Sequence, residues 1–289
     1  MAKPKPANSA CDPSRTRKGG TRKRVSPIAR AESPADASAD GSAKSAMGTK
    51  HARSRTGGRT IPSQDVARPS GADGAAEPAP DCTLCPRLVS FRTTNRDIQP
   101  DLFNAPVPSF GNGAGRLLIV GLAPGLKGAN RTGRPFTGDY AGDLLYATLL
   151  KFGFARGDYE ARPDDGLKLV DCMITNAVRC VPPENKPTPA EIACCRPFLK
   201  NRILASGKLV AILALGRIAH DQTLAALELR KAAFPFSHGA IHAIGGGMTL
   251  ADSFHCSRYN TNTGRLTPAM FEDVFRDIRN LIDTPCSGN

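Results

Sequence analysis

The first 80 residues contain no Phe, Tyr or Trp. They are crowded with Ala, Ser, Pro, Gly, Lys and Arg, a composition that cannot bury enough apolar area to offset the entropy of ordering the chain. They carry 15 Lys and Arg against 7 Asp and Glu, in a chain of 289 residues with a net charge of +13. We therefore predict a disordered basic tail over residues 1–80 and a folded domain over residues 81–285.

Long apolar runs are also missing. No stretch approaches the roughly 20 apolar residues of a membrane span, and the N-terminus has no apolar segment typical of a secretory signal. We therefore expect no membrane association. The basic charge suggests a polyanionic partner such as nucleic acid, although a solvated tail that aids solubility fits the charge equally well. A cytoplasmic, nucleoid-associated location follows from the first alternative.

Both common phosphate-binding motifs are absent from the loop that follows the apolar run LLIV at residues 117–120. A P-loop needs Lys followed by Ser or Thr, but Lys127 is followed by Gly128, and GxGxxG is missing. The run itself predicts a buried parallel strand, and open α/β sheets bind ligands at the loops that leave such strands. We therefore predict that residues 121–143, GLAPGLKGANRTGRPFTGDYAGD, carry chemistry other than nucleotide phosphate binding.

Strand and helix signals alternate through the rest of the chain. Apolar runs predict further strands at residues 173–178, 208–215 and 249–254, and helices are predicted between and after them, the last beginning at Thr267 and Pro268. The expected fold class is α/β: a single three-layer α/β/α domain with a central, mostly parallel four-stranded sheet. Because parallel strands end at one edge, we expect polar groups from three loops to meet there.

Nine cysteines are present, and four of them form two pairs. Cys82 and Cys85 are a CxxC, and Cys180 and Cys195 follow later. In a reducing compartment such pairs indicate metal or redox chemistry rather than disulfides. Four thiolates suit a tetrahedral zinc ion or a cubane iron–sulfur cluster, and the spacing does not separate these two. The alternative is that the cysteines are small buried apolar residues.

Three motifs together resemble the family 5 uracil-DNA glycosylases: GLAPGLKGANRTGRPFTGD, TNAVRC with EIACCRP, and FHCSRYNTNTGRLT. The resemblance runs from about Cys82 to the final helix. It implies a DNA repair hydrolase that flips uracil, and other deaminated or damaged bases, out of double-stranded DNA and hydrolyses the N-glycosidic bond. The product is an abasic site, the first step of base excision repair. It also implies a 4Fe-4S cluster on Cys82, Cys85, Cys180 and Cys195, and we expect a monomer.

The resemblance also implies roles for individual residues. Phe136 would stack on the base and Asn176 would read its edge. His255 would stabilise charge on the leaving base, and Asn130 would hold the attacking water, with Asp139 as a less favoured candidate. The full set of substrate-binding residues is Gly121, Leu122, Ala123, Gly125, Phe136 and Asn176. The expected DNA contacts are Arg131, Arg134, Arg258 and Tyr259.

Departures from better-known uracil glycosylases shape these expectations. Ala123 stands where those enzymes have an aspartate that activates water, and Gly125 stands where they have an aromatic residue, which suggests a roomier pocket. Cys256 replaces the proline of the family's His-Pro-Ser loop, so one rigid φ is lost. The competing hypothesis is a non-catalytic, metal-stapled nucleic-acid-binding protein, which would need the arginines but would have no use for converging Asn130, Asn176 and His255.

Overall fold

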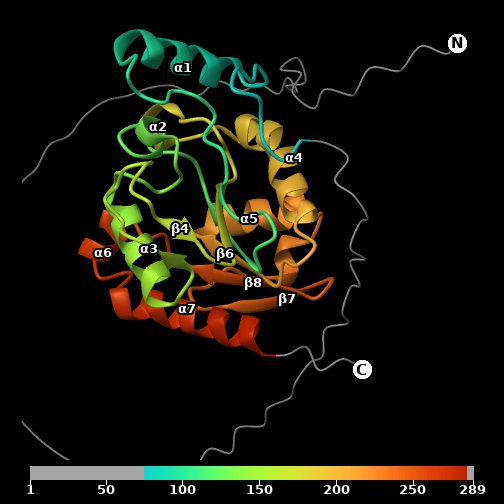
Figure 1. Ribbon diagram of the computed structural model, residues 1–289. Helices are drawn as coiled ribbons and strands as arrows, with labels where there is room; N and C mark the ends of the chain where they lie inside the picture. The colour runs from blue at the N-terminus through green and yellow to red at the C-terminus, as the bar shows by residue number, and fades with distance from the viewer. Residues whose placement is uncertain (1–74, 285–289) are drawn as a thin grey trace, which may run out of the picture. The chain divides into compact units, whose positions relative to one another are not determined.

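The structure is a computed structural model that describes residues 75–284 (Figure 1). Most of the predicted tail lies outside the described residues, so its disorder stays a prediction. Residues 75–80, however, pack on the domain. The carboxylate of Glu77 accepts hydrogen bonds from Arg179 Nη1 at 2.7 Å and from Arg202 Nη2 at 2.6 Å. The folded part therefore begins before residue 81, because an acidic side chain at the end of the basic segment pairs with two arginines of the domain.

A six-stranded sheet runs through the domain in the order β1-β5-β2-β6-β8-β7. The four central strands are parallel, and both edge strands are antiparallel to their neighbours. The strands of this sheet are β1 Phe110–Gly111, β2 Leu117–Gly121, β5 Cys172–Asn176, β6 Ala211–Leu215, β7 Ile241–Gly245 and β8 Met248–Ser253. A separate two-stranded sheet joins β3 Ala155–Arg156 to β4 Lys168–Leu169.

The predicted mostly parallel sheet is confirmed, but the predicted number of four strands is wrong. The four predicted strands are the parallel ones. The sequence did not reveal β1, which has only two residues, or β7, whose half-exposed residues and flanking glycines hide the alternation of a strand. Both edges are short or irregular, and β7 carries a register shift after Ala243, as is common at sheet edges.

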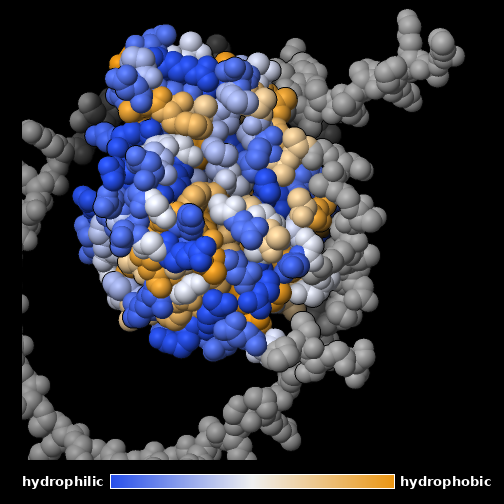
Figure 2. Space-filling model, in the orientation of Figure 1, coloured by the Kyte–Doolittle hydropathy of each residue, from blue (hydrophilic) through white to orange (hydrophobic). Residues whose placement is uncertain are grey.

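Helices cover both faces of the sheet (Figure 1). The α-helices are α1 Pro86–Ile98, α2 Ala129–Thr132, α3 Tyr140–Lys151, α4 Pro189–Ala205, α5 Arg217–Ala226, α6 Arg258–Asn262 and α7 Pro268–Asp283, and the 3-10 helices are η1 Pro183–Asn185 and η2 Lys231–Ala233. None of the helices within residues 75–284 combines the length and the apolar character that crossing a membrane requires. Hydrophilic residues cover the outward sides of α1 and α7 (Figure 2).

Alternate residues of the central strands supply the two cores. Leu117 and Ile119 of β2 pack with α3 and α7, and Leu118 and Val120 pack with α4 and α5. Every residue of β2 is buried, because a parallel strand in the middle of a three-layer domain is covered on both faces. This rigid centre fixes where the loops after the strands begin, and these loops carry the predicted chemistry.

Helix starts follow their sequence signals. Thr188 and Glu191 form the predicted capping box at α4, with Pro189 at the first helical position. At α3 the Asp139 side chain accepts a hydrogen bond from Gly142 N. Residues 121–143 are therefore not one continuous loop, since they include α2 and the first turn of α3.

Candidate active site

A cavity of about 650 Å³ opens at the carboxyl ends of β2 and β5. Gly121 and Asn176 end these two strands and lie opposite each other in register. His255 follows the C-terminal end of β8 and reaches the same edge. The cavity is lined by Leu122, Ala123, Pro124, Gly125, Lys127, Ala129, Phe136, Gly138, Asp139, Tyr140, Ala141, Asn176, Asn185, His255, Ser257 and Arg258.

Gly121 has no side chain, and this leaves the space that the side chains of Phe136 and Asn176 occupy. A Cβ added there would lie 2.6 Å from Phe136 Cζ and would also collide with Asn176 Oδ1. Glycine is thus required for Phe136 and Asn176 to approach each other at the strand end. Asn176 is 2% exposed, and its Oδ1 has no hydrogen-bond partner within the described part of the chain. A buried acceptor left in this way costs free energy unless a ligand supplies a donor.

Phe136 has an unusual backbone for an aromatic residue, with φ at 53°. Such a conformation costs on the order of 1–3 kcal/mol and occurs most often at functional sites. Its ring centroid lies 6.0 Å from that of His255, with an angle of 31° between the planes. The two rings and the amide of Asn176 therefore border one part of the cavity.

The surroundings of His255 favour the neutral form of its imidazole. Burial lowers its pKa below the ordinary value of 6.5, and the opposing effect of the Asp139 charge is smaller. Its loop is fixed by Asn260 Nδ2, which donates to His255 O at 2.8 Å, and by Ser257, whose side chain caps α6. Cys256 is fully buried, with its Sγ 3.4 Å from Ala141 O, so the residue that replaces the family's proline packs against α3.

Asn130 lies behind the cavity wall rather than on it. It is 1% exposed, and its Nδ2 donates to Asn104 Oδ1 at 2.8 Å. The described residues that border the cavity include Asp139 but not Asn130. The geometry therefore favours Asp139, the less favoured candidate from the sequence, for contact with water in the cavity.

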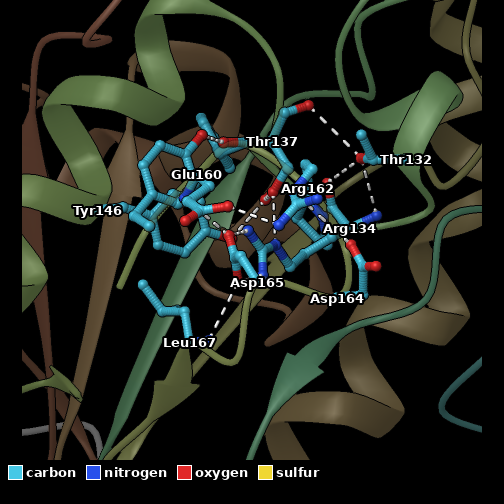
Figure 3. A network of polar contacts seen from close by, with 12 residues as sticks. Thr132, Arg134, Thr137, Tyr146, Glu160, Arg162, Asp164, Asp165 and Leu167 are labelled. Carbon is cyan, nitrogen blue, oxygen red and sulfur yellow. Dashed lines mark hydrogen bonds and ion pairs between the residues drawn. The ribbon is translucent and has the colours of Figure 1, made fainter. Parts of the chain in front are cut away.

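Arg134 does not lie where a DNA contact is expected. It is 4% exposed, and its guanidinium donates to both oxygens of buried Asp165, at 2.8 and 2.6 Å (Figure 3). Its Nε donates to Thr137 Oγ1 at 2.8 Å, and Tyr146 Oη donates to Pro135 O at 2.7 Å. These hydrogen bonds fix the positions of residues 134–137 and so support the strained backbone of Phe136. The expected DNA contact by Arg134 is corrected to a structural role, since its donors point inward to Asp165 and Thr137.

The other three predicted DNA contacts lie at the surface. Arg131 and Arg258 are exposed, and Tyr259 is 72% exposed. Arg258 also borders the cavity and stacks over the Tyr140 ring, 5.4 Å from its centroid. An exposed aromatic next to an arginine at the mouth of a cavity suits contact with nucleic acid.

The sequence analysis missed Asn185 and Tyr140 on the cavity wall. Asn185 ends η1, and both it and Glu184 have positive φ, 58° and 54°. The pair of prolines before them signals a turn, but only the fold shows that the turn reaches the cavity.

The four predicted metal ligands converge between α1, α4 and the end of β5. Cys82, Cys85, Cys180 and Cys195 border one small cavity together with Leu88 and Phe198, and Cys194 borders it too. Arg92 Nη1 lies 3.5 Å from Cys180 Sγ, and Arg179 N donates to Cys195 Sγ at 3.4 Å. Burial raises the pKa of Cys85 to about 11 and that of Cys195 to about 12. Burial thus favours the protonated thiol, whereas metal coordination favours the thiolate, because a coordinating thiol is deprotonated.

Residues 108–279 match the family model described as the uracil DNA glycosylase superfamily. The chain is 45% identical over 205 residues to the type-5 uracil-DNA glycosylase of Thermus thermophilus, covering 69% of this chain and 93% of that protein. It is 42% identical over 208 residues to the type-5 enzyme of Mycobacterium tuberculosis, covering 69% and 78%. The type-5 enzyme of Pyrobaculum aerophilum is 37% identical over 209 residues, covering 71% and 90%. This chain therefore belongs to the uracil-DNA glycosylase superfamily.

Proposed function

We propose that this protein is a monofunctional uracil-DNA glycosylase of the type-5 kind, which hydrolyses the bond between uracil and deoxyribose in DNA as a step of repair. The observation that carries the proposal is the convergence of Phe136, Asn176 and His255 on one cavity at the edge of the sheet. The relatives are named for this activity. A module that only binds nucleic acid has no use for a buried amide oxygen in a pocket that lacks a hydrogen-bond partner among residues 75–284, so the competing hypothesis explains less.

Asn176 is the group that would identify the base. Uracil presents an N–H donor between two carbonyl acceptors, and an asparagine amide matches a neighbouring donor and acceptor on that edge. The unpartnered Asn176 Oδ1 would accept from the ring N–H of uracil, while its Nδ2 would donate to a carbonyl. Phe136 would lie against the face of the base. The duplex holds uracil in its stack, so this contact requires the nucleotide to flip into the pocket.

His255 would stabilise the leaving group. As the glycosidic bond breaks, negative charge develops on the uracil carbonyl oxygen nearest the sugar, and a neutral imidazole can donate an N–H to it. Burial lowers the pKa of His255 and so favours the neutral ring that this role uses. The electron pair of the broken bond stays on the base, and water is then captured at the sugar carbon to leave an abasic site.

Asp139 would orient that water. Its side chain is exposed on the cavity wall, so a carboxylate oxygen can accept a hydrogen bond from water and take up its proton. Ala123 and Gly125 border the same cavity and leave it open beside the base. The room at Gly125 supports the proposal that other deaminated or damaged bases are also substrates.

The cysteine site would hold a 4Fe-4S cluster on Cys82, Cys85, Cys180 and Cys195. In residues 75–284, no three of these sulfurs lie within 4.8 Å of one another. A tetrahedral zinc with bonds of about 2.3 Å would place its sulfurs about 3.8 Å apart. The wider spacing supports a polynuclear cluster, as do the N–H groups near Cys180 and Cys195 and the apolar wall. Hydrolysis transfers no electrons, so the cluster would stabilise the fold and place α1 against DNA.

The test is release of uracil from duplex oligonucleotides that contain one uracil opposite guanine or adenine, measured under single-turnover conditions by alkaline cleavage at the abasic site. We expect cleavage by the wild type. Both His255→Ala and Asn176→Ala should lower the rate by about 10²-fold or more, as loss of a donor at a developing charge does.

The matched control is Asn280→Ala on the exposed side of α7, which removes the same atoms far from the pocket. It should cleave at the wild-type rate. A wild-type protein that binds DNA and retains its iron but releases no base would overturn the proposed activity. Equal rates in wild type and Asn176→Ala would overturn the proposed recognition of the base.

A further inference from the structure

A cluster of ligand-type side chains lies outside the cavity, on α5, β7 and β8. His220, His242 and Asp252 each offer one atom, and these three atoms all lie within 4.8 Å of one another. His220 is 1% exposed, Asp252 is completely buried, and His242 is partly exposed. None of the three borders the active-site cavity or the cysteine cavity. The proposed glycosylase reaction therefore leaves this cluster unexplained.

The hydrogen bonds of the cluster leave two atoms unsatisfied. His220 Nδ1 lies 2.7 Å from Asp252 Oδ1, and His220 Nε2 lies 2.9 Å from Phe234 O. His242 Nε2 lies 3.4 Å from Asp252 Oδ2, yet neither of these buried atoms has a hydrogen-bond partner within the described residues. A completely buried carboxylate is costly unless both its oxygens are compensated. Asp252 Oδ2 lies near His242 Nε2, but the two atoms do not form a hydrogen bond.

We propose that His220, His242 and Asp252 form a second metal site, distinct from the cysteine site, which binds one divalent cation of the zinc class. His220 Nδ1, His242 Nε2 and a carboxylate oxygen of Asp252 are the ligands. Two histidines and one carboxylate, with water in a fourth position, are an established set of ligands for zinc. Of the three side chains only that of His242 is partly exposed, and its Nε2 is itself buried.

The surroundings of His220 support this assignment. A histidine that binds metal through one ring nitrogen usually donates the other N–H to a carbonyl or carboxylate, which fixes the tautomer. His220 Nε2 faces Phe234 O in this way. The ring of Phe236 lies edge-on to His220 and that of Phe234 edge-on to His242, with centroids 5.5 and 5.8 Å away. These rings form an apolar shell that limits access of water and strengthens charge interactions inside it.

One ion can bind all three side chains only after they rearrange, because His220 faces Oδ1 of Asp252 and His242 faces Oδ2. Zinc bonds of about 2.0–2.1 Å place neighbouring ligand atoms about 3.3–3.4 Å apart. The separation of His242 Nε2 from Asp252 Oδ2 is 3.4 Å and already has this value. The 2.7 Å between His220 Nδ1 and Asp252 Oδ1 would have to open. Binding would release the proton shared by that pair, so the two lone pairs then face the ion.

The site would stabilise the end of β8, the strand that His255 follows. Asp252 is near the end of β8, and its backbone N donates to Ala240 O at 2.9 Å while its O accepts from Gly239 N at 2.8 Å. A metal ion at this point would tie α5, β7 and β8 together three residues before His255. Its role is structural, and it does not depend on which base the active site accepts.

The experiment measures zinc and iron in the full-length protein that has been incubated with zinc chloride and then desalted. We expect about one zinc per chain in the wild type. In His242→Gln and Asp252→Asn the zinc should be lost while the iron content is unchanged. His238→Gln, a change of a neighbouring histidine outside the cluster, should keep the zinc. Zinc bound by the cysteines would survive in all three variants, so the two sites are distinguished.

The midpoint of thermal unfolding, measured with and without added zinc, is a second test of the site. Added zinc should raise the midpoint of the wild type and of His238→Gln but not of His242→Gln. His242→Gln is the decisive variant, because its partly exposed side chain can change without opening the core, whereas Asp252→Asn could also weaken folding. A wild type that retains no zinc would overturn the proposal. So would zinc retention by His242→Gln at the wild-type level, and the cluster would then be a hydrogen-bonded ion pair.

Discussion

At the scale of single residues, Asp139 has two roles that can be separated. One oxygen accepts from Gly142 N at 3.1 Å and caps α3, and the other faces Gly125 and Gly128 on the cavity side. We predict that Asp139→Asn lowers the single-turnover rate of uracil release by about 10²-fold or more, because the amide cannot accept a proton from water. The cap should survive, since asparagine caps helices as well as aspartate does.

Replacing Asn130 should affect stability rather than the rate of uracil release. Asn130→Ala removes the donor to buried Asn104 Oδ1, so we predict a loss of about 1–3 kcal/mol in the free energy of unfolding and a small effect on the chemical step. Single-turnover rates and urea unfolding of both variants test the pair of predictions. A larger rate loss in Asn130→Ala than in Asp139→Asn, at equal folded fraction, would show that Asn130 rather than Asp139 orients the attacking water.

The buried pair of Arg134 and Asp165 should dominate the stability of the loop that carries Phe136. The Arg134 guanidinium holds the pKa of Asp165 below its usual range, mainly through their hydrogen bonds. We predict that Asp165→Asn costs about 3–5 kcal/mol of unfolding free energy at pH 7, because it leaves a buried cation uncompensated. The neighbouring Asp164→Asn is the control, since Asp164 is exposed and lies 4.0 Å from Arg162.

This effect should depend on pH in one direction. Asp165 has a lower pKa in the folded than in the unfolded state, so its contribution is complete above about pH 4 and is lost as the pH falls through the folded pKa. The difference between wild type and Asp165→Asn, measured by urea unfolding, should therefore shrink below about pH 4. A difference that stays constant into acid would show that the carboxylate charge is not what stabilises the loop.

At the scale of elements, α1 depends on the cysteine site. The helix begins directly after Cys85, its Leu88 packs in the apolar cluster around the cysteines, and Arg87 lies 2.7 Å from Glu191. We predict that Cys85→Ala loses iron, sulfide and visible absorption, and that α1 becomes sensitive to protease before the active site loses its chemistry. Cys172→Ala, a change of a buried cysteine in β5, should keep the iron. A colourless Cys85→Ala protein with a protected α1 and normal DNA affinity would contradict this role of the cluster.

The sequence predicted elements best where one local signal decided them. The fully buried runs gave the four parallel strands, and the capping residues at Thr188 and Thr267 gave the starts of α4 and α7. The edge strands were missed because β1 is too short to show a pattern, and β7 is stabilised by pairing with β8 rather than by its own residues. Local preference is weak evidence at a sheet edge, where tertiary contacts decide.

The place of each site residue in the fold explains which of them could be predicted from the sequence. Asn176 is the last residue of β5 and His255 follows the end of β8, so the topology itself brings both to the cavity. Within residues 129–139 the chain turns through α2, and whether a side chain points in or out depends on contacts far along the sequence. Arg134 meets Asp165 and Asn130 meets Asn104 in this way. The family resemblance suggested DNA and water contacts for Arg134 and Asn130, but only the fold shows that both side chains point inward.

At the scale of the whole molecule, the charge of the chain is concentrated outside the described domain. Residues 1–74 carry 15 Lys and Arg against 6 Asp and Glu, out of a net charge of +13. Each phosphate neutralised by a basic residue releases counterions, so affinity for duplex DNA falls with salt in proportion to the number of contacts. We predict that deletion of residues 1–74 weakens binding to undamaged duplex at low salt and reduces the slope of log affinity against log salt.

The deletion should leave uracil release unchanged at saturating protein, because every residue of the proposed site lies between residues 121 and 258. The cut belongs after residue 74 rather than after residue 80, since Glu77 pairs with Arg179 and Arg202 and its removal would leave a buried guanidinium without its partner. Fluorescence anisotropy over a range of salt concentrations gives the slope. An unchanged slope in the deletion variant would assign the phosphate contacts to the domain, with Arg131 and Arg258 as the first to replace. A reduced slope with an unchanged single-turnover rate would mean that the tail holds the enzyme on DNA while the pocket alone selects the base.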